Sequence, residues 1–140
     1  KTLFLNYTRA QDNILDSAQD ALEWLSMRPV VIPEQYIPAG LELVEQAART
    51  VLLLHPALES TIRLVHGDIF DRKAVKENYR AVRAQHKAVR KAKAAIASAV
   101  YASDMDFKDI HQLMHFFDGM HAMSHNAEGC ADILRAMIAR

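Results

Sequence analysis

The chain has 140 residues, 51% of them hydrophobic, and its 17 basic and 17 acidic residues give a formal net charge of zero. This length predicts one domain with a core of its own, and the balanced charge argues against nucleic acid or an anionic membrane as partner. No apolar run reaches about 18 residues, so no membrane span is expected. The single cysteine, Cys130, fits a reducing compartment. We therefore expect a soluble cytoplasmic protein.

A first helix is expected over residues 7–27, with Asn6 as its N-cap and the apolar residues 3–5 outside it. Asp12, Asp16 and Glu23, with Gln19 between them, recur at four-three-four spacing and share one stripe of this helix. Such a stripe of acidic residues is most often simply a solvent-exposed face of the helix.

A second helix is expected to start near Pro33 or Pro38 and to run to residue 66, where Gly67 ends it. Pro56 should free the Leu52 carbonyl and kink the helix, with His55 on the apolar stripe beside the kink. The expected core residues are Ile37, Leu41, Val44, Ala48, Val51, Leu58, Ile62 and Val65.

A third helix, residues 72–102, is expected after a cap at Asp68 or Asp71. Its predicted buried stripe is Val75, Tyr79, Val82, His86, Val89, Lys93, Ile96 and Val100. Nine of the 17 basic residues lie on this helix: Arg72, Lys73, Lys76, Arg80, Arg83, Lys87, Arg90, Lys91 and Lys93. We interpret them as a solvated face, because no aromatic residues interleave with them to stack bases and the acidic first helix offers counter-charge.

The last helix, residues 106–139, carries two stripes. The apolar stripe is Phe107, Ile110, Met114, Phe117, Leu134 and Ile138. The other stripe is rich in metal-ligand atoms and contains Asp118, His121, His125, Glu128 and Asp132, with His111 and His115 extending it backwards.

Four helices joined by short links predict an all-α, elongated up-and-down bundle. Counting residues from the turns places His55, His86 and His121 or His125 in one layer. Two interpretations stay open for that layer. It binds a transition metal with Asp118 or Glu128 as oxygen ligand, or it is a set of core histidines paired with carboxylates and the carbonyl that Pro56 frees.

Two segments resemble a known family: RAQDNILDSAQD at residues 9–20, followed by Ile32-Pro33, and HNAEGCAD at residues 125–132. They are similar to motifs of the PhoU-like phosphate-transport regulators that accompany Pit-type phosphate permeases. The resemblance implies two repeated three-helix units, each with a Glu/Asp-x-x-x-Asp metal motif. Residues 1–28 would then be the last helix of the first unit and residues 33–140 the second unit, within one domain of residues 1–140.

The chain departs from the family pattern at several positions. Gln19 stands where Glu is usual, His125 stands where Asp is usual, and Gln85 and Val89 occupy the positions of an acidic motif. The matching carboxylates are Asp12, Asp16, Glu128 and Asp132.

Two functions are compatible with these patterns. The first is a non-enzymatic regulator of phosphate uptake that contacts a phosphate permease or phosphate-sensing partner through Asp12, Asp16 and Asp20. It would reach the membrane through that partner and form homo-oligomers. It would hold a divalent or iron-type metal ion with Asp12, Asp16, His121, His125, Glu128 and Asp132. The alternative is a metal-dependent, di-iron-like bundle enzyme, which needs paired Glu-x-x-His motifs. Here Asp118-x-x-His121 is one approximate half, and the sequence has no second copy.

Overall fold

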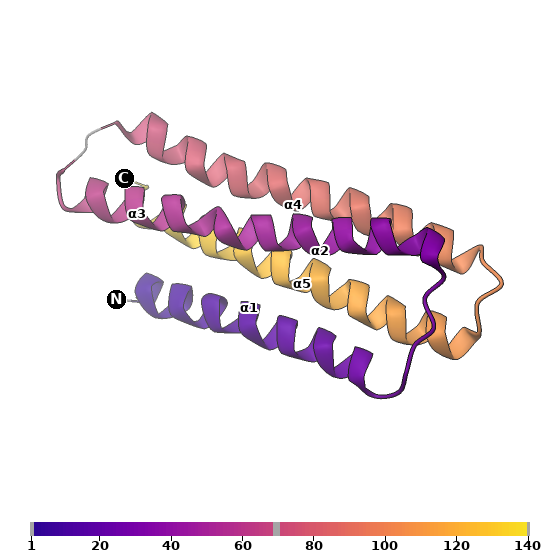
Figure 1. Cartoon of the computed structure of the whole chain (residues 1–140). Coiled ribbons are helices and arrows are strands. Elements are labelled where there is room, and N and C mark those ends of the chain that lie inside the picture. Colours follow the sequence, from indigo (N-terminus) through magenta and orange to yellow (C-terminus); the bar gives the residue numbers. More distant parts are fainter. Residues whose placement is uncertain (1, 69–70, 140) are drawn as a thin grey trace.

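The computed structural model describes residues 2–68 and 71–139. Lys1, Ile69, Phe70 and Arg140, which the expected domain includes, lie outside these ranges. The described chain is helical, in the order α1 Thr2–Ser26, η1 Glu34–Tyr36, α2 Ile37–Leu52, α3 Leu54–Val65, α4 Arg72–Tyr101 and α5 Phe107–Ile138. Because α2 and α3 follow one another as a single broken column, four columns run alternately up and down (Figure 1). The predicted all-α, up-and-down bundle is confirmed.

Helix α1 begins earlier than the sequence suggested. It includes residues 3–5, and the Thr8 hydroxyl donates to the Phe4 carbonyl at 3.1 Å. Asn6 is therefore inside the helix, and its predicted role as N-cap is wrong. The missed signal is the four-three-four spacing of Leu3, Tyr7, Ala10 and Ile14, which is typical of a helix and of which Tyr7 and Ile14 are buried.

The expected interruption of the second column lies at Leu53, between α2 and α3. Pro56 has no N–H to offer to the carbonyl of Leu52, and its ring crowds that carbonyl, so the helix breaks one residue later. The column ends as predicted at Gly67, whose φ of 80° favours glycine. The N–H of Asp68 donates to the Arg63 carbonyl, as in a Schellman C-cap.

The face that α2 and α3 bury differs from the predicted stripe. The buried residues are Leu43, Ala47, Thr50, Leu54, Ala57 and Thr61. Several residues predicted for the core are instead exposed, among them Leu41 at 58% and Val65 at 66%. The reason is close packing. Small alanines let the column approach α4 and α5, and the Thr50 and Thr61 hydroxyls donate to carbonyls four residues earlier, so they can be buried without loss.

Helices α4 and α5 follow the prediction closely. Asp71 and Asp106 are the N-caps, accepting from the N–H groups of Ala74 and Lys108. The predicted stripe of α4 is buried except Lys93, which is half-buried and forms an ion pair with Asp118 at 2.7 Å. Phe107 was expected in the core of α5 but is 70% exposed. It is the first residue of that helix, at the end of the bundle, where no other column covers it.

Helix α1 packs mainly against α5. They approach closely at Gly119, where a Cβ would lie 2.5 Å from the Cβ of Ala21 and 3.3 Å from the Ser17 carbonyl oxygen. Asn126 then donates to the Ser17 hydroxyl and to the Asn13 carbonyl. Gly119 thus lets two backbones meet, and it does not interrupt α5.

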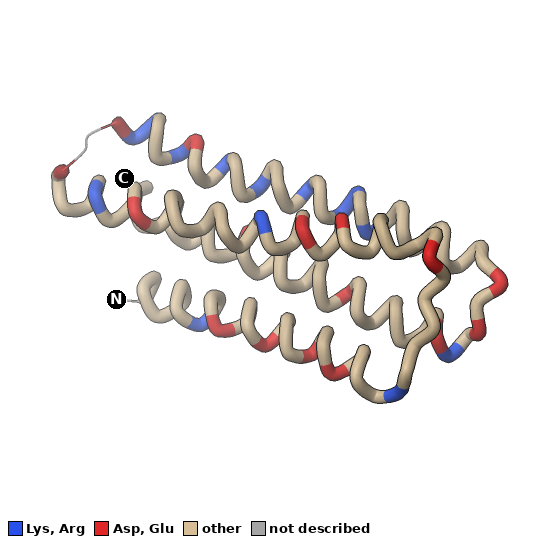
Figure 2. Tube along the Cα trace, in the orientation of Figure 1, with Lys and Arg blue, Asp and Glu red and all other residues tan. Residues whose placement is uncertain are grey.

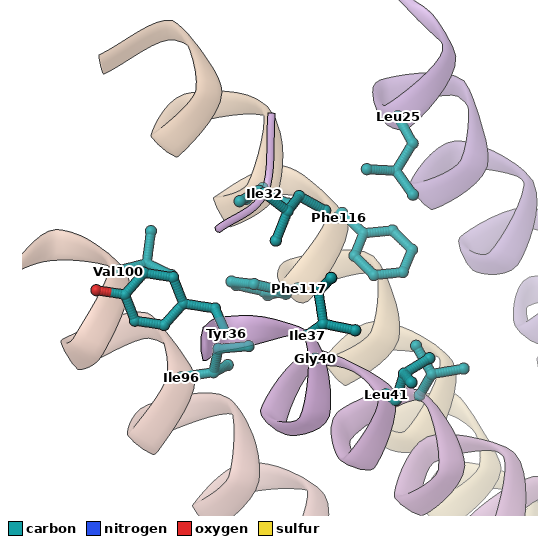
Figure 3. A pocket seen from close by; sticks show the side chains of 12 residues that line it. Leu25, Ile32, Tyr36, Ile37, Gly40, Leu41, Ile96, Val100, Phe116 and Phe117 are labelled. Atoms are coloured by element: carbon teal, nitrogen blue, oxygen red, sulfur yellow. The ribbon is translucent and has the colours of Figure 1, made fainter. Parts of the chain in front are cut away.

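The other side of α1 meets α2 and α3 less closely, and apolar residues remain open there. One pocket, between the α1 end, η1, α2, α4 and α5, is lined almost wholly by apolar side chains, including Leu25, Ile32, Ile37, Leu41 and Phe116 (Figure 3). We call the exposed residues on this side the apolar face: Phe4, Leu15, Ile37, Leu41, Ile62 and Val65.

Candidate functional site

A histidine cluster lies where α4 and α5 pack together. His86 comes from the middle of the buried stripe of α4 and is 4% exposed. On α5, His121 and His125 are one turn apart, so both present their rings to the same side. Their ring centroids lie 5.2 and 5.7 Å from that of His86. Three imidazoles therefore meet where α4 and α5 pack together, as expected for His86 with His121 or His125 in the predicted layer.

A chain of hydrogen bonds orients the His86 ring. The Thr50 hydroxyl donates to the Gln46 carbonyl at 3.0 Å, so its hydrogen is committed, and Ser124 Oγ must donate to Thr50 Oγ1 at 3.3 Å. Ser124 Oγ can then only accept from His86 Nδ1, which lies 2.6 Å away. This direction of the hydrogen bonds corresponds to the tautomer of neutral His86 that carries its proton on Nδ1 and a lone pair on Nε2.

Glu128 completes the cluster from the next turn of α5. His86, His125 and Glu128 each offer a ligand atom, and these atoms all lie within 4.8 Å of one another. Within residues 2–68 and 71–139, no other three histidine, cysteine or acidic side chains come together in this way. Glu128 also forms no ion pair or hydrogen bond with a described residue, so its carboxylate is free to act as a ligand.

Burial and neighbouring charge favour neutral imidazoles at His86 and His121. The pKa of His86 is lowered, chiefly by burial, while Glu128 acts in the opposite direction. The pKa of His121 is lowered by burial and then by Lys93. A neutral imidazole carries the lone pair that a metal ion needs.

The six residues predicted as metal ligands are not gathered into one site. His125 and Glu128 lie together, and His121 lies beside them against His86. Asp132 is at the surface, with its carboxylate 3.1 Å from the Arg83 guanidinium. Asp12 and Asp16 are exposed on α1 and join no ligand group with the acidic residues of α5 among the described residues. The carboxylates that the family resemblance would pair therefore do not form a common cluster in this chain.

His55 is not part of the layer, and that expectation is wrong. Its side chain is 83% exposed and lies 3.6 Å from Glu59 on the same helix. The preceding residue, Leu54, occupies the buried position instead. Counting residues from the turns sets only the height of His55, whereas the break at Leu53 sets the direction in which α3 presents each side chain.

His111 and His115 also leave the cluster stripe. The His115 ring stacks on Trp24 of α1 with centroids 3.8 Å apart, and His111 meets the edge of the same indole. Nearby, Arg28 donates to Asp109 at 2.7 Å and to Gln112 at 2.9 Å. These contacts fasten the end of α1 to α5, a role that the sequence pattern did not indicate.

A second candidate surface is an acidic ridge along α1, which we define as Asp12, Asp16, Asp20 and Glu23 (Figure 2). All four side chains are exposed, and none forms an ion pair with another described residue. Two basic residues of α4 pair with carboxylates of α5, Arg83 with Asp132 and Lys93 with Asp118, and Arg80 pairs with Glu77 within α4. The expectation that α1 would neutralise α4 is wrong, because α1 packs on α5 and lies away from α4 (Figure 2).

The fold and these surfaces define the class of protein: a four-column helical bundle with a histidine and glutamate cluster between two helices and an acidic outer ridge. Comparison of the chain with protein-family models, curated proteins and solved structures finds no match. Among the described helices, none combines the length and the apolar character needed to cross a membrane.

Proposed function

We propose that this chain is a non-enzymatic regulatory or accessory protein of inorganic phosphate transport that binds a phosphate permease or phosphate-sensing partner. The resemblance of residues 9–20 and 125–132 to the PhoU-like regulators supports the choice of process. The observation that carries the mode of action is the acidic ridge of α1, which is fully presented to solvent.

The ridge is costly for the helix that bears it. Asp12, Asp16 and Asp20 are spaced four residues apart and Glu23 follows three later, so like charges face one another along the helix. Each such pair destabilises a helix by about 0.2–0.5 kcal/mol. Since no described cation neutralises the ridge, its stability cost is best accounted for by a positively charged binding partner.

Such a partner is available on the cytoplasmic side of a membrane. Cytoplasmic loops of membrane proteins carry an excess of Lys and Arg, and contact with them would bring this chain to the membrane as a peripheral protein. An exposed charged contact of this kind weakens as salt is added. The proposal therefore places the protein in the cytoplasm and excludes nucleic acid as its partner.

The apolar face supports the further proposal that the chain forms homo-oligomers. Leu15 is 70% exposed and Val65 is 66% exposed, and the residues of this face lie on neighbouring columns rather than singly. Contiguous apolar surface of this kind is typical of interaction sites. The acidic ridge remains outside the apolar face, so both surfaces can be engaged together.

The test is co-purification of the chain with a candidate phosphate permease. The triple variant Asp12→Asn, Asp16→Asn, Asp20→Asn should reduce capture at least about tenfold, because three exposed charge contacts at about 0.5 kcal/mol each sum to about 1.5 kcal/mol. Its thermal stability should stay the same or rise slightly.

The matched control changes three other exposed acidic residues, Glu42→Gln, Glu45→Gln and Asp104→Asn, which lie off the ridge. This variant has the same change in net charge and should be captured like the parent chain. Equal capture of both variants would exclude the ridge as the contact surface, and failure of the parent chain to bind would remove support for the proposed function.

The di-iron-like enzyme is the weaker proposal. The cluster of His86, His125 and Glu128 supports it, because it offers histidine and carboxylate ligands inside a helical bundle. A di-iron site uses several carboxylates to bridge two ions, and this cluster contains one. Oxygen-consumption measurements on iron-loaded protein would separate the two functions.

A further inference from the structure

We propose that His86, His125 and Glu128 bind one divalent first-row transition-metal ion between α4 and α5. This inference is independent of partner binding. The three ligand atoms lie within 4.8 Å of one another, and ligands that share an ion at about 2.0–2.2 Å lie roughly 3–4 Å apart. Rotation of the two α5 side chains would bring the three atoms closer together. Both side chains have room to rotate, because His125 is exposed and Glu128 is half-buried.

The ligand types select the class of metal. Two imidazoles and one carboxylate suit zinc, iron(II), cobalt or nickel, whereas magnesium and calcium prefer oxygen ligands alone. Three protein ligands leave at least one coordination position open for water or another ligand. His121 lies alongside, its ring centroid 5.2 Å from that of His86.

The surroundings of His86 match those of a metal-binding histidine. Such a residue donates its second ring N–H to a neighbouring acceptor, which fixes the ring and its tautomer. Here the hydrogen-bond chain through Ser124 and Thr50 does this and leaves Nε2 without a hydrogen-bond partner among the described residues. Among the described residues, Arg135 Nε is the only side-chain nitrogen or oxygen that is both fully buried and without a hydrogen-bond partner. Because His86 Nε2 has no partner either, it must be partly accessible to solvent.

The alternative, a core histidine paired with a carboxylate, lacks its carboxylate contact. Glu128 is the acidic member of the cluster, and it forms no ion pair or hydrogen bond with His86 or His125 in the described structure. The neighbouring cations do not exclude a metal ion either. Lys93 is paired with Asp118 at 2.7 Å, and at His86 the charge of Glu128 counteracts that of Arg90.

The test uses Co²⁺ as probe, because a cobalt ion held by nitrogen and oxygen ligands has visible absorption. The purified chain, freed of metal with a chelator, is titrated with Co²⁺ at pH 7.5, followed by Zn²⁺ as competitor. We expect saturation at one ion per chain and displacement by Zn²⁺. His125→Ala and Glu128→Gln should each weaken binding by at least about tenfold, and Ser124→Ala, which removes the hydroxyl that orients His86, by about tenfold.

His111→Ala is the matched control, since it removes one member of another histidine pair spaced four residues apart on α5. It should leave Co²⁺ binding unchanged, as should the triple asparagine variant of the acidic ridge. Both ligand variants change residues that are not buried, so folding is checked simply by circular dichroism. No saturable Co²⁺ binding, unchanged binding in His125→Ala and Glu128→Gln, or loss in His111→Ala would each overturn the proposal.

Discussion

Adding one methyl group at Gly119 tests the packing of α1 on α5. The Cβ of Gly119→Ala would lie 2.5 Å from the Cβ of Ala21 and 3.1 Å from its Cα. The second of these atoms belongs to the backbone, so no side-chain rotation can relieve the clash. The two helices must separate, and α1 loses contacts along its principal packing surface.

The magnitude follows from two opposing terms. Replacing a mid-helix glycine with alanine favours the helix by about 1 kcal/mol, while overpacking a close contact costs about 1–3 kcal/mol. Because backbone lies opposite, we expect the larger cost, for a net loss of about 1–2 kcal/mol. Gly129→Ala is the matched control on the same helix. Its added Cβ meets nothing within 4 Å, so it should gain about 0.5–1 kcal/mol.

Urea unfolding followed by circular dichroism measures both variants against the parent chain. The midpoint should fall for Gly119→Ala and rise for Gly129→Ala, with a difference of about 1.5–3 kcal/mol between them. In thermal melts each kcal/mol corresponds to roughly 2–4 °C for a chain of this size. If both variants gain stability equally, the close approach of α1 and α5 at Gly119 is wrong.

Two further measurements address the cluster and the apolar face. Thermal stability should fall as the pH drops from 7.5 to 5.5. The pKa of His86 and of His121 is lowered in the folded chain, so below about pH 6.5 the unfolded state binds more protons than the folded state. His86→Asn should flatten this pH dependence, and an equally steep profile in that variant would contradict the reasoning. Leu15→Glu with Leu41→Glu should shift the chain from oligomer to monomer in sedimentation velocity, and a parent chain that is already monomeric would refute self-association.

The sequence alone determined the helices and most of their ends. Long apolar stripes without proline set α4 and α5, and Asp71, one of the two caps expected for α4, is the N-cap of that helix. Pro56 and Gly67 act through the backbone of their own helix, so their effects were predictable from position alone. The metal-ligand stripe of α5 was likewise visible, because residues three or four apart must share a face.

Tertiary structure decided which apolar face of each helix became the core. The column α2–α3 is apolar on two adjacent faces, and close packing chose the one with Ala47 and Ala57 over the one with Leu41 and Val65. Sequence periodicity indicates that a helix is amphipathic. It does not show whether a face with alanines and hydrogen-bonded threonines or a face with larger apolar side chains will be buried.

The candidate site shows the same division. The sequence placed His125 and Glu128 on one stripe, but only the packing of α4 against α5 brought His86 to them and turned Asp132 to Arg83. His55 was predicted at the same height along the bundle, but its side chain is exposed to solvent. The direction in which a side chain points depends on how its helix is rotated about its own axis. That rotation is set by contacts between columns, which lie far apart in sequence and leave no local pattern.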